Sequence, residues 1–467
     1  MTTSVVVEDT GFGVRAAVLD DDRRLIEIRD GDRDDPRVTD ALFAARVTAV
    51  DPKLNAAFVD CGLPRPALLV AKDARAVAGG GERRPIRELV REGQRLIVQG
   101  LREPVDDKGA RVTSDVRLFG YALVHAPFAA SADPTRGQGR RRDDELRARG
   151  LALFPEGGFA LRRHAAGLPD EALREESHQL AVRWRGIEAA ARTAKPGRLP
   201  EPEGPVERLL RGLVELEPAS VAVADRALAL ELERLLAAAP TLPPLQVVRL
   251  DPDEPAFAQT GVDEALELAL GAEVPLRRGG RLLVQPTAAC VAIDVDGGGR
   301  TPLDADLEAA PEIARQVRLR NLGGTIVVDF VDLPTRPERQ RLEEALKKAF
   351  RGDPAPVEVH AMSSLGIVQI SRARRGEPLA SLFLAPCACC AGSGRQPSAR
   401  AGAENLLTAL RCERHPVARV RVAPGLRDFL AGPGAGAWRR AVERLGQEPA
   451  LVADPTLPPG GSAIDGG

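Results

Sequence analysis

Two acidic residues close apolar runs in the same part of the chain. Asp294 ends CVAID and Asp329 ends TIVVD, and both runs are short, rich in β-branched residues and bounded by glycine, which predicts buried strands. The segment between them, DLEAAPEIARQVRLRNLGG, has acidic residues early, apolar residues at helical spacing, arginine late and Gly-Gly after its end, which predicts a helix. A right-handed βαβ crossover makes the strands parallel, so both aspartates would lie at the strand ends where open α/β sheets hold ligands.

Two carboxylates held close repel each other unless a cation or a shared proton intervenes. Hard oxygen ligands with open positions suit Mg²⁺, which would polarise a phosphoryl oxygen and activate water. The alternative is that Asp329 and Asp332 cap a strand end within a loop. Periodicity alone does not separate the two interpretations.

Composition bounds the function. The chain has 467 residues, 44% of them hydrophobic, which is enough for several domains with real cores. With 65 Lys and Arg against 67 Asp and Glu, a nucleic-acid surface would have to come from local arginine clusters. Aromatic residues make up only 3%, which limits base stacking.

Location and redox chemistry follow from the same sequence. The N-terminus, MTTSVVVEDTGFG, lacks the features of a signal peptide, and no run is apolar and long enough to span a bilayer, so we expect a cytoplasmic protein without a membrane span. Six cysteines are too few for a disulfide scaffold in so long a chain, and three crowd into CACC. That cluster suggests a metal.

The pattern along the chain predicts several domains. Short alternating strands fill the start, and those between about residues 45 and 124 suggest a small barrel of the OB type. DEALREESHQLAVRWRGIEAAAR predicts a long surface helix, and the proline-rich KPGRLPEPEGP marks a boundary. Helices and strands alternate beyond it, and a small unit with two helical patterns follows CACCAGSGR.

The chain resembles the RNase E/G family of endoribonucleases, in its short, RNase G-like form without a long disordered tail. DPKLNAAFVDCG, VREGQRLIVQ, LEAAPEIARQVRLRNLGGTIVVDFVDL and the C-x-x-C-x-G-x-G of residues 387–394 carry the resemblance, in the family's order. It implies Mg²⁺-dependent hydrolysis of single-stranded, AU-rich RNA, leaving a 5′-phosphate and a 3′-hydroxyl, in rRNA maturation or mRNA turnover. Without a tail, scaffolding of other enzymes is not expected.

The resemblance also implies a fold, an α+β multidomain chain with a DNase I-like α/β catalytic domain. The expected parts are an RNase H-like domain split into residues 1–38 and 206–272, an OB-fold RNA-binding insertion at 39–124, a 5′-end sensor region at 125–205, the DNase I-like catalytic domain at 273–384, a zinc link at 385–398 and a small dimerisation domain at 399–467.

Asp294 and Asp329 fall on the family's catalytic metal-ligand positions. The sequence departs from the family pattern beside them, because Ala288, Asp296 and Gly297 replace Glu, Asn and Ser. Asp296 lies two residues past Asp294, hence on the same side of a continuing strand, where it can add a water-mediated ligand or merely add negative charge.

Further positions match RNA contacts of the family, each with a simpler structural explanation. In the OB-type domain these are Phe58, which could instead be core, and Lys108, while Leu68 replaces a second aromatic. In the end sensor, Arg162 and Arg163 take the places of an Arg-Thr pair and Arg140 and Arg141 match a second basic element. Without the resemblance, the residues alone favour a solvated charge run. Candidate phosphate contacts in the catalytic domain are Arg315, Arg318, Arg372 and Arg374, of which the first two could lie on an exposed helix face.

Cys387 and Cys390 supply two thiolates, half of a tetrahedral zinc site. In the family two chains share such a site, which implies structural Zn²⁺, a homodimer and dimers that pair into tetramers. An intrachain alternative would use Cys412 and His415, and Cys389 could replace either thiolate. The competing function is a catalytically weakened RNA-binding paralogue that dimerises and presents RNA, motivated by Ala288, Asp296, Gly297 and Leu68.

Overall fold

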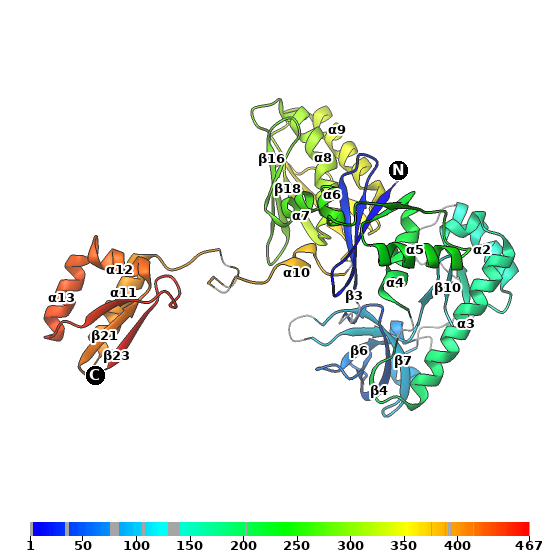
Figure 1. The fold of residues 1–467 in the computed structure, drawn as a ribbon, viewed down its shortest axis with the longest axis horizontal. Helices are drawn as coiled ribbons and strands as arrows, with labels where there is room; N and C mark the ends of the chain where they lie inside the picture. The colour runs from blue at the N-terminus through cyan, green and yellow to red at the C-terminus, as the bar shows by residue number, and fades with distance from the viewer. Residues whose placement is uncertain are drawn as a thin grey trace. The chain divides into compact units, whose positions relative to one another are not determined.

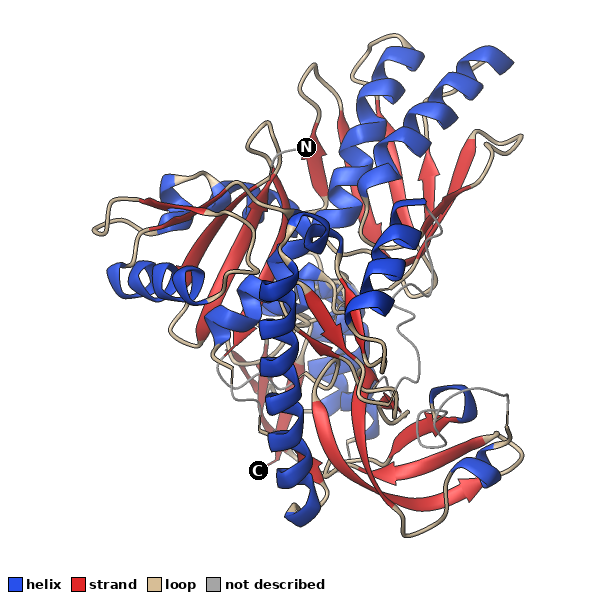
Figure 2. Ribbon diagram, turned by 90° about the vertical axis from the view of Figure 1, so that its right-hand side faces the viewer, coloured by secondary structure: helices blue, strands red, loops and turns tan. Residues whose placement is uncertain are grey.

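The computed structural model describes residues 3–32, 37–74, 84–104, 108–128, 141–200, 203–374, 376–387, 389–390, 392, 394–413 and 415–466. The chain separates into two compact units, Met1–Leu382 and Phe383–Gly467. Helices and strands are mixed along the chain (Figure 2), which confirms the mixed α/β, multidomain fold predicted from the sequence. Within the described ranges, no helix is both long enough and apolar enough to cross a bilayer.

The first sheet is built from two distant segments of the chain. Strands β1 (Ser4–Asp9), β2 (Gly13–Leu19) and β3 (Leu25–Asp32) are antiparallel, and β13 (Ser220–Val223) and β14 (Gln246–Arg249) continue the sheet in parallel pairing beyond β1. Helices α4 (Pro205–Leu213) and α5 (Arg226–Ala238) share its buried cluster. The Asp225 carboxylate caps α5 by accepting from the backbone N–H of Leu228.

A closed ring of strands follows β3. Strand β4 pairs with β5 and also with β7, and β6 and β8 complete the ring, so the sheet closes on itself. Its interior is filled by a cluster of buried apolar side chains. The elements are β4 (Leu42–Asp51), β5 (Ala56–Asp60), β6 (Ala67–Val70), α1 (Ile86–Leu89), β7 (Arg95–Arg102) and β8 (Arg111–Thr113), with β12 (Gly197–Arg198) added to β4.

A small three-stranded sheet and two helices follow the ring along the chain and share one buried cluster. The long helix predicted from its apolar spacing is confirmed, because one stripe of α3, Leu173, Leu180, Trp184 and Ile187, is buried. The elements are β9 (Leu118–Phe119), β10 (Leu123–His125), α2 (Arg141–Leu153), β11 (Phe159–Leu161) and α3 (Asp170–Thr193).

The sheet that carries Asp294 and Asp329 has six strands in the order β15-β16-β17-β18-β20-β19. Strands β17 and β18 are parallel and joined by α8, so the predicted βαβ unit is confirmed. Helices α8 and α9 lie side by side against one face of this sheet (Figure 1) and share its core. The elements are α6 (Ala256–Gln259), α7 (Val262–Leu270), β15 (Glu273–Pro275), β16 (Arg281–Pro286), β17 (Val291–Asp296), α8 (Pro302–Leu319), β18 (Gly324–Asp329), α9 (Arg336–Ala349), β19 (Val357–Val359), β20 (Ile367–Arg372) and α10 (Leu379–Phe383).

Local signals explain where these helices begin. Helix α8 starts after Thr301 with Pro302 in its first turn, and α9 starts with a capping box in which Thr335 and Glu338 satisfy each other's backbone N–H groups. The opposite sheet face, which carries every second residue of β17 and β18, contains the two aspartates.

The second unit is a small α/β domain with its own core. Strand β21 lies between β22, which is parallel to it, and β23, which is antiparallel. The Ser398 hydroxyl caps α11. The elements are α11 (Ala399–Cys412), β21 (Val417–Val422), α12 (Pro424–Ala431), α13 (Ala435–Leu445), β22 (Ala450–Ala453) and β23 (Ser462–Gly466).

Candidate active site

Asp294 and Asp329 are direct register partners on the parallel strands β17 and β18. Register partners project to the same face, and neighbouring strands lie about 4.8 Å apart. Both aspartates are exposed, whereas Ile293 and Val328 on the opposite face are 1% and 0% exposed. The structure therefore brings the two carboxylates together on one open face.

The residues present fit a magnesium ion by the chemistry of their donors. In the described ranges, no group of three or more His, Cys, Asp or Glu side chains is arranged to hold a metal, so the edge offers a pair of carboxylates. Mg²⁺ usually binds through one or two carboxylates and keeps several waters. Among the described residues, none forms a hydrogen bond or an ion pair with the carboxylate of Asp294 or Asp329.

Asp296 shares this face but has partners of its own. It is the register partner of Arg281 on β16, with 3.5 Å between the Arg281 Nε and one carboxylate oxygen, and its other oxygen accepts from the backbone N–H of Gly298 at 3.0 Å. Arg281 also pairs with Glu273 at 3.1 Å. The contacts therefore favour neutralisation of the added charge by Arg281 over a role for Asp296 as a free ligand.

The backbone around the acidic edge is held by close glycine contacts. Gly280 has φ +85°, and a Cβ there would lie 2.2 Å from the carbonyl oxygen of Asp296. A Cβ on Gly297 would lie 3.2 Å from the Cβ of Ala305 and 3.4 Å from a methyl of Val331. The β15–β16 turn and the start of α8 thus pack directly against the end of β17.

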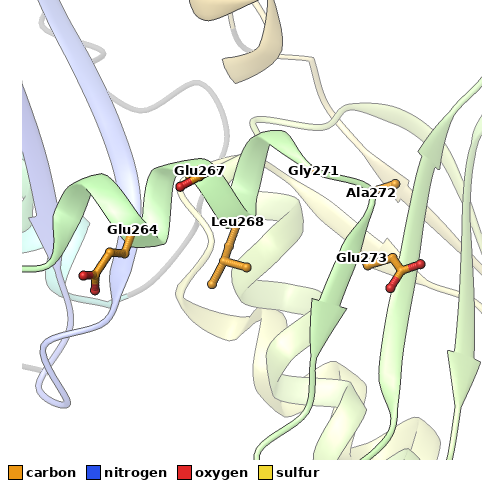
Figure 3. A pocket seen from close by; sticks show the side chains of 6 residues that line it. All are labelled: Glu264, Glu267, Leu268, Gly271, Ala272 and Glu273. Carbon is orange, nitrogen blue, oxygen red and sulfur yellow. The ribbon is translucent and has the colours of Figure 1, made fainter.

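A pocket borders the same sheet at the junction of α7 and β15. It is lined by Glu264, Glu267, Leu268, Gly271, Ala272 and Glu273 (Figure 3). The register places Glu273 beside Leu283, which is beside Asp294, so one strand separates the pocket from the aspartates. Its three carboxylates would repel RNA phosphates, and we assign it no part in the site.

The closed ring of strands presents Phe58 and Leu68 as register neighbours. Both side chains are half-buried and neither belongs to the buried cluster of the ring, whereas Ala57 and Val59 are fully buried. Phe58 therefore faces outward and is not a core residue. Lys108 is exposed, and Arg111, the register partner of Leu68, pairs with Asp73 at 2.7 Å.

The residues expected to sense RNA 5′ ends have different surroundings. Arg162 is buried, donates to the carbonyl of Gly120 at 2.7 Å and pairs with Glu215 at 3.2 Å, and burial lowers its pKa. Arg163 is exposed. Arg140 lies outside the described residues, and Arg141 begins α2 with a side chain that is not described.

Arg315 and Arg318 join α8 to the first sheet. Arg315 donates to the carbonyl of Leu25 at 2.6 Å, and Arg318 pairs with Glu27 at 2.9 Å, both on β3. Burial raises the pKa of Glu27, but Arg29 and Arg318 outweigh it and hold that pKa below its ordinary value. This geometry favours a role in joining the two sheets over contact with phosphate.

Arg372 and Arg374 also differ from one another. Arg372 is 3% exposed and forms a bidentate pair with Asp353 at 2.9 and 3.0 Å. Arg374 is exposed and lies against Gly323, where a Cβ would be 2.8 Å from the Arg374 Cα. It sits beside Gly323, just before β18 begins, and a rise of about 3.3 Å per residue puts it roughly 20 Å from Asp329.

The cysteine link belongs to the second unit. Cys387 is exposed, and the backbone N–H groups of Cys389 and Cys390 lower its pKa, which favours the thiolate that binds metal. Within the described part of the chain, Cys387, Cys390, Cys412 and His415 are not gathered into one metal-binding group.

Asp306 was not singled out in the sequence, where it looked like one of the acids that start α8. The structure buries it completely, and its carboxylate accepts from the backbone N–H of Val331. A signal was present, because Asp306 is in helical phase with the buried Ala309, Ile313 and Val317.

The profile of the Ribonuclease E/G family matches residues 118–375, which include the whole βαβ unit. The chain belongs to this family. It is 31% identical over 379 residues to Ribonuclease G of Haemophilus influenzae and 32% identical over 375 residues to Ribonuclease G of Escherichia coli, covering 76% of each chain in both pairs.

Ribonuclease E of Nostoc sp. is also similar to this member of the Ribonuclease E/G family, at 29% identity over 381 residues. That match covers 78% of this chain but 56% of the Nostoc protein. The resemblance inferred from the four sequence blocks is thereby confirmed.

Proposed function

We propose that this chain hydrolyses single-stranded RNA with Mg²⁺, leaving a 5′-phosphate and a 3′-hydroxyl, in rRNA maturation or mRNA turnover. It is an endoribonuclease of the Ribonuclease E/G family, as its similarity to proteins named Ribonuclease G indicates. The single observation that carries the magnesium part is the register pairing of Asp294 with Asp329 on an open sheet face.

In this proposal Asp294 and Asp329 are the protein ligands of the ion. When bound, Mg²⁺ supplies Lewis-acid chemistry for a phosphodiester and its attacking water. The open face leaves room for an RNA strand over the carboxylates, and α8 and α9 close the opposite face. Arg281 offsets the charge of Asp296, which lowers the repulsion that an incoming phosphate meets.

RNA binding draws on the outward face of the strand ring. Phe58 offers an aromatic face for a base, a contact typically worth about 1–3 kcal/mol, and Leu68 beside it adds apolar area without a second ring. Lys108 and Arg163 are exposed cations that can meet phosphates. Arg162, Arg315, Arg318 and Arg372 serve the fold in this proposal.

The proposal extends to the domains. In it the split first sheet corresponds to the RNase H-like domain, the closed ring to the OB fold and the six-stranded sheet to the DNase I-like domain. Cys387 and Cys390 supply half of a tetrahedral zinc set, so two chains would share one Zn²⁺ in a homodimer, and such dimers can pair into tetramers.

A cleavage assay tests the catalytic proposal. The substrate is a fluorescent, 5′-monophosphorylated single-stranded RNA, incubated with Mg²⁺ or with EDTA. We expect Mg²⁺-dependent cutting that Asp294→Asn reduces by at least about 100-fold. Glu273→Gln is the matched control, because it also removes an exposed carboxylate from the same sheet face. The Glu273→Gln chain should cut the RNA as the original chain does. Ligation of an adaptor to the products identifies their 5′-phosphates.

Other results of this assay and of a zinc measurement are informative. Cutting that persists in EDTA contradicts the magnesium proposal, and tight RNA binding without cutting favours the weakened RNA-binding paralogue. Faster cutting of the 5′-monophosphate than of the matching 5′-hydroxyl RNA would support end sensing. Zinc at half an equivalent per chain, measured together with molecular mass, would support the shared site, whereas one equivalent on a monomer would contradict it.

A further inference from the structure

The buried carboxyl of Asp306 is not explained by the helix that carries it. Asp306 lies in α8 and is 0% exposed. One of its oxygens accepts from the backbone N–H of Val331 at 3.1 Å, and the other, also buried, has no hydrogen-bond partner among the described residues. Its helical neighbours toward the sheet, Ala305, Ala309 and Ala310, are apolar and fully buried.

Such a group costs stability. Burial raises the pKa of Asp306 to about 7, although the N–H of Val331 opposes the rise. A buried carboxyl oxygen without a partner forfeits its hydration, and apolar side chains of similar volume are often neutral or stabilising in its place. The core of the six-stranded sheet would be satisfied by a hydrophobic residue here, so the carboxyl must serve something else.

Its one partner leads to the catalytic edge. The ladder of β18 ends at Asp329, which pairs with Asp294 on one side and Ile367 on the other. The N–H of Val331 follows just beyond the end of this ladder, and Asp306 accepts it. Gly297 lies at the same junction, where an added Cβ would contact Ala305 and Val331. The start of α8, the end of β17 and the exit of β18 therefore form one packed unit.

We propose that Asp306 is a positioning residue that fixes the chain leaving β18 and so sets the Asp329 carboxylate relative to Asp294. This inference rests on the proposed function, in which these two aspartates hold Mg²⁺. Groups that orient metal ligands without touching the metal typically contribute 10–100-fold in metal affinity. Asp306 acts through the backbone and does not contact the reacting atoms.

Two substitutions separate positioning from general support of the fold. Asp306→Asn keeps an oxygen that can accept from the N–H of Val331, and Asp306→Leu has similar size but no acceptor. Gln316→Leu is the matched control, because Gln316 is a buried polar residue of the same helix, 1% exposed, whose side chain contacts Glu312 and Arg320 and not β18.

The measurements are isothermal titration of the full chain with MgCl₂ and with MnCl₂ in the absence of RNA, and thermal unfolding without metal. We expect Asp306→Leu to weaken ion binding roughly 10–100-fold while its melting temperature stays equal or rises. Asp306→Asn should bind within about threefold of the original chain. Gln316→Leu should lower the melting temperature and leave ion binding unchanged.

Normal ion binding by Asp306→Leu overturns the inference, and so does a loss of binding that merely follows a loss of stability. If Asp306→Leu does not fold, Asp306→Ala is judged by the same two measurements. The original chain and Asp294→Asn test the proposed function separately. If the original chain binds no Mg²⁺, both proposals fail, whereas an effect of Asp294→Asn without one of Asp306→Leu rejects the positioning role alone.

Discussion

The two ends of the βαβ unit place their charged residues in opposite surroundings. Near the start of α8, Asp294 and Asp329 are exposed on the open face of the sheet. Near its end, Arg315 and Arg318 are half-buried against β3, and on β20 Arg372 is enclosed with Asp353. The acidic end is open to a ligand, while the arginine end is occupied by the protein itself.

The difference shows that charge type does not predict which residues are free to act. An arginine has five donors, which suit nearby carbonyls and carboxylates as well as they suit phosphate. Asp294 and Asp329 are like-charged neighbours without a cationic partner among the described residues, so a neutralising cation has to come from a ligand. Substitutions at each end test whether the two ends differ in this way.

The largest effect is expected from Arg372→Ala. It leaves the 4% exposed carboxylate of Asp353 buried without its partner, which typically costs about 3–5 kcal/mol of unfolding free energy. Urea denaturation measures this loss. Arg374→Ala, the exposed neighbour, is the control and should change stability by less than about 0.5 kcal/mol. If the Arg372→Ala chain is stable but binds RNA more weakly, Arg372 contacts phosphate, as the sequence suggested.

A smaller loss is expected from Arg318→Ala. Its paired side chains are each 17% exposed, and a hydrogen bond to a charged group contributes about 1.5–3 kcal/mol. The free energy of unfolding should fall by that amount, while affinity for a single-stranded RNA, measured by fluorescence anisotropy, stays the same. Unchanged stability together with weaker RNA binding would show that Arg318 contacts RNA instead of joining the sheets.

The sequence predicted the acidic end well because its signals are local. The strands that end in Asp294 and Asp329, the helix between them and the glycines after it all lie within one short segment, and a right-handed crossover then forces the parallel pairing. Helical phase and strand alternation were sufficient to place both carboxylates on one face.

The arginine end could not be predicted because its partners are remote in sequence. Arg318 meets Glu27 across 291 positions, and Arg162 reaches Glu215 in a different segment of the chain. Asp306 depended in the same way on the tertiary position of Val331. Phe58 lies between these two cases. Strand alternation separates the two faces of its strand, but only the neighbouring strands show which face points outward.

The pairing of Arg318 with Glu27 also predicts a pH dependence. The folded-state pKa of Glu27 lies below its ordinary value of 4.5, so the chain gains stability from this group above that pH and loses it as pH falls through the folded pKa. Glu27→Gln should therefore make the unfolding free energy less dependent on pH below about 4.5. Urea denaturation of both chains from neutral to acidic pH measures the difference, and parallel curves would contradict the pairing.

The smallest effect is expected from Arg281→Ala, at the open acidic edge. Arg281 and Asp296 are each 52% exposed, and such pairs contribute less than about 1 kcal/mol to stability. Removing the cation leaves Asp296 un-neutralised two residues from Asp294, roughly 7 Å away, where a unit charge attracts a divalent ion in water by about 1 kcal/mol. Titration with MgCl₂ should then show binding roughly fivefold tighter. Arg281→Lys keeps the charge and should bind Mg²⁺ as the original chain does. Weaker Mg²⁺ binding by Arg281→Ala would mean that Arg281 orients the aspartates directly. The acidic end of the βαβ unit would then depend on arginine contacts within the protein, as the arginine end does.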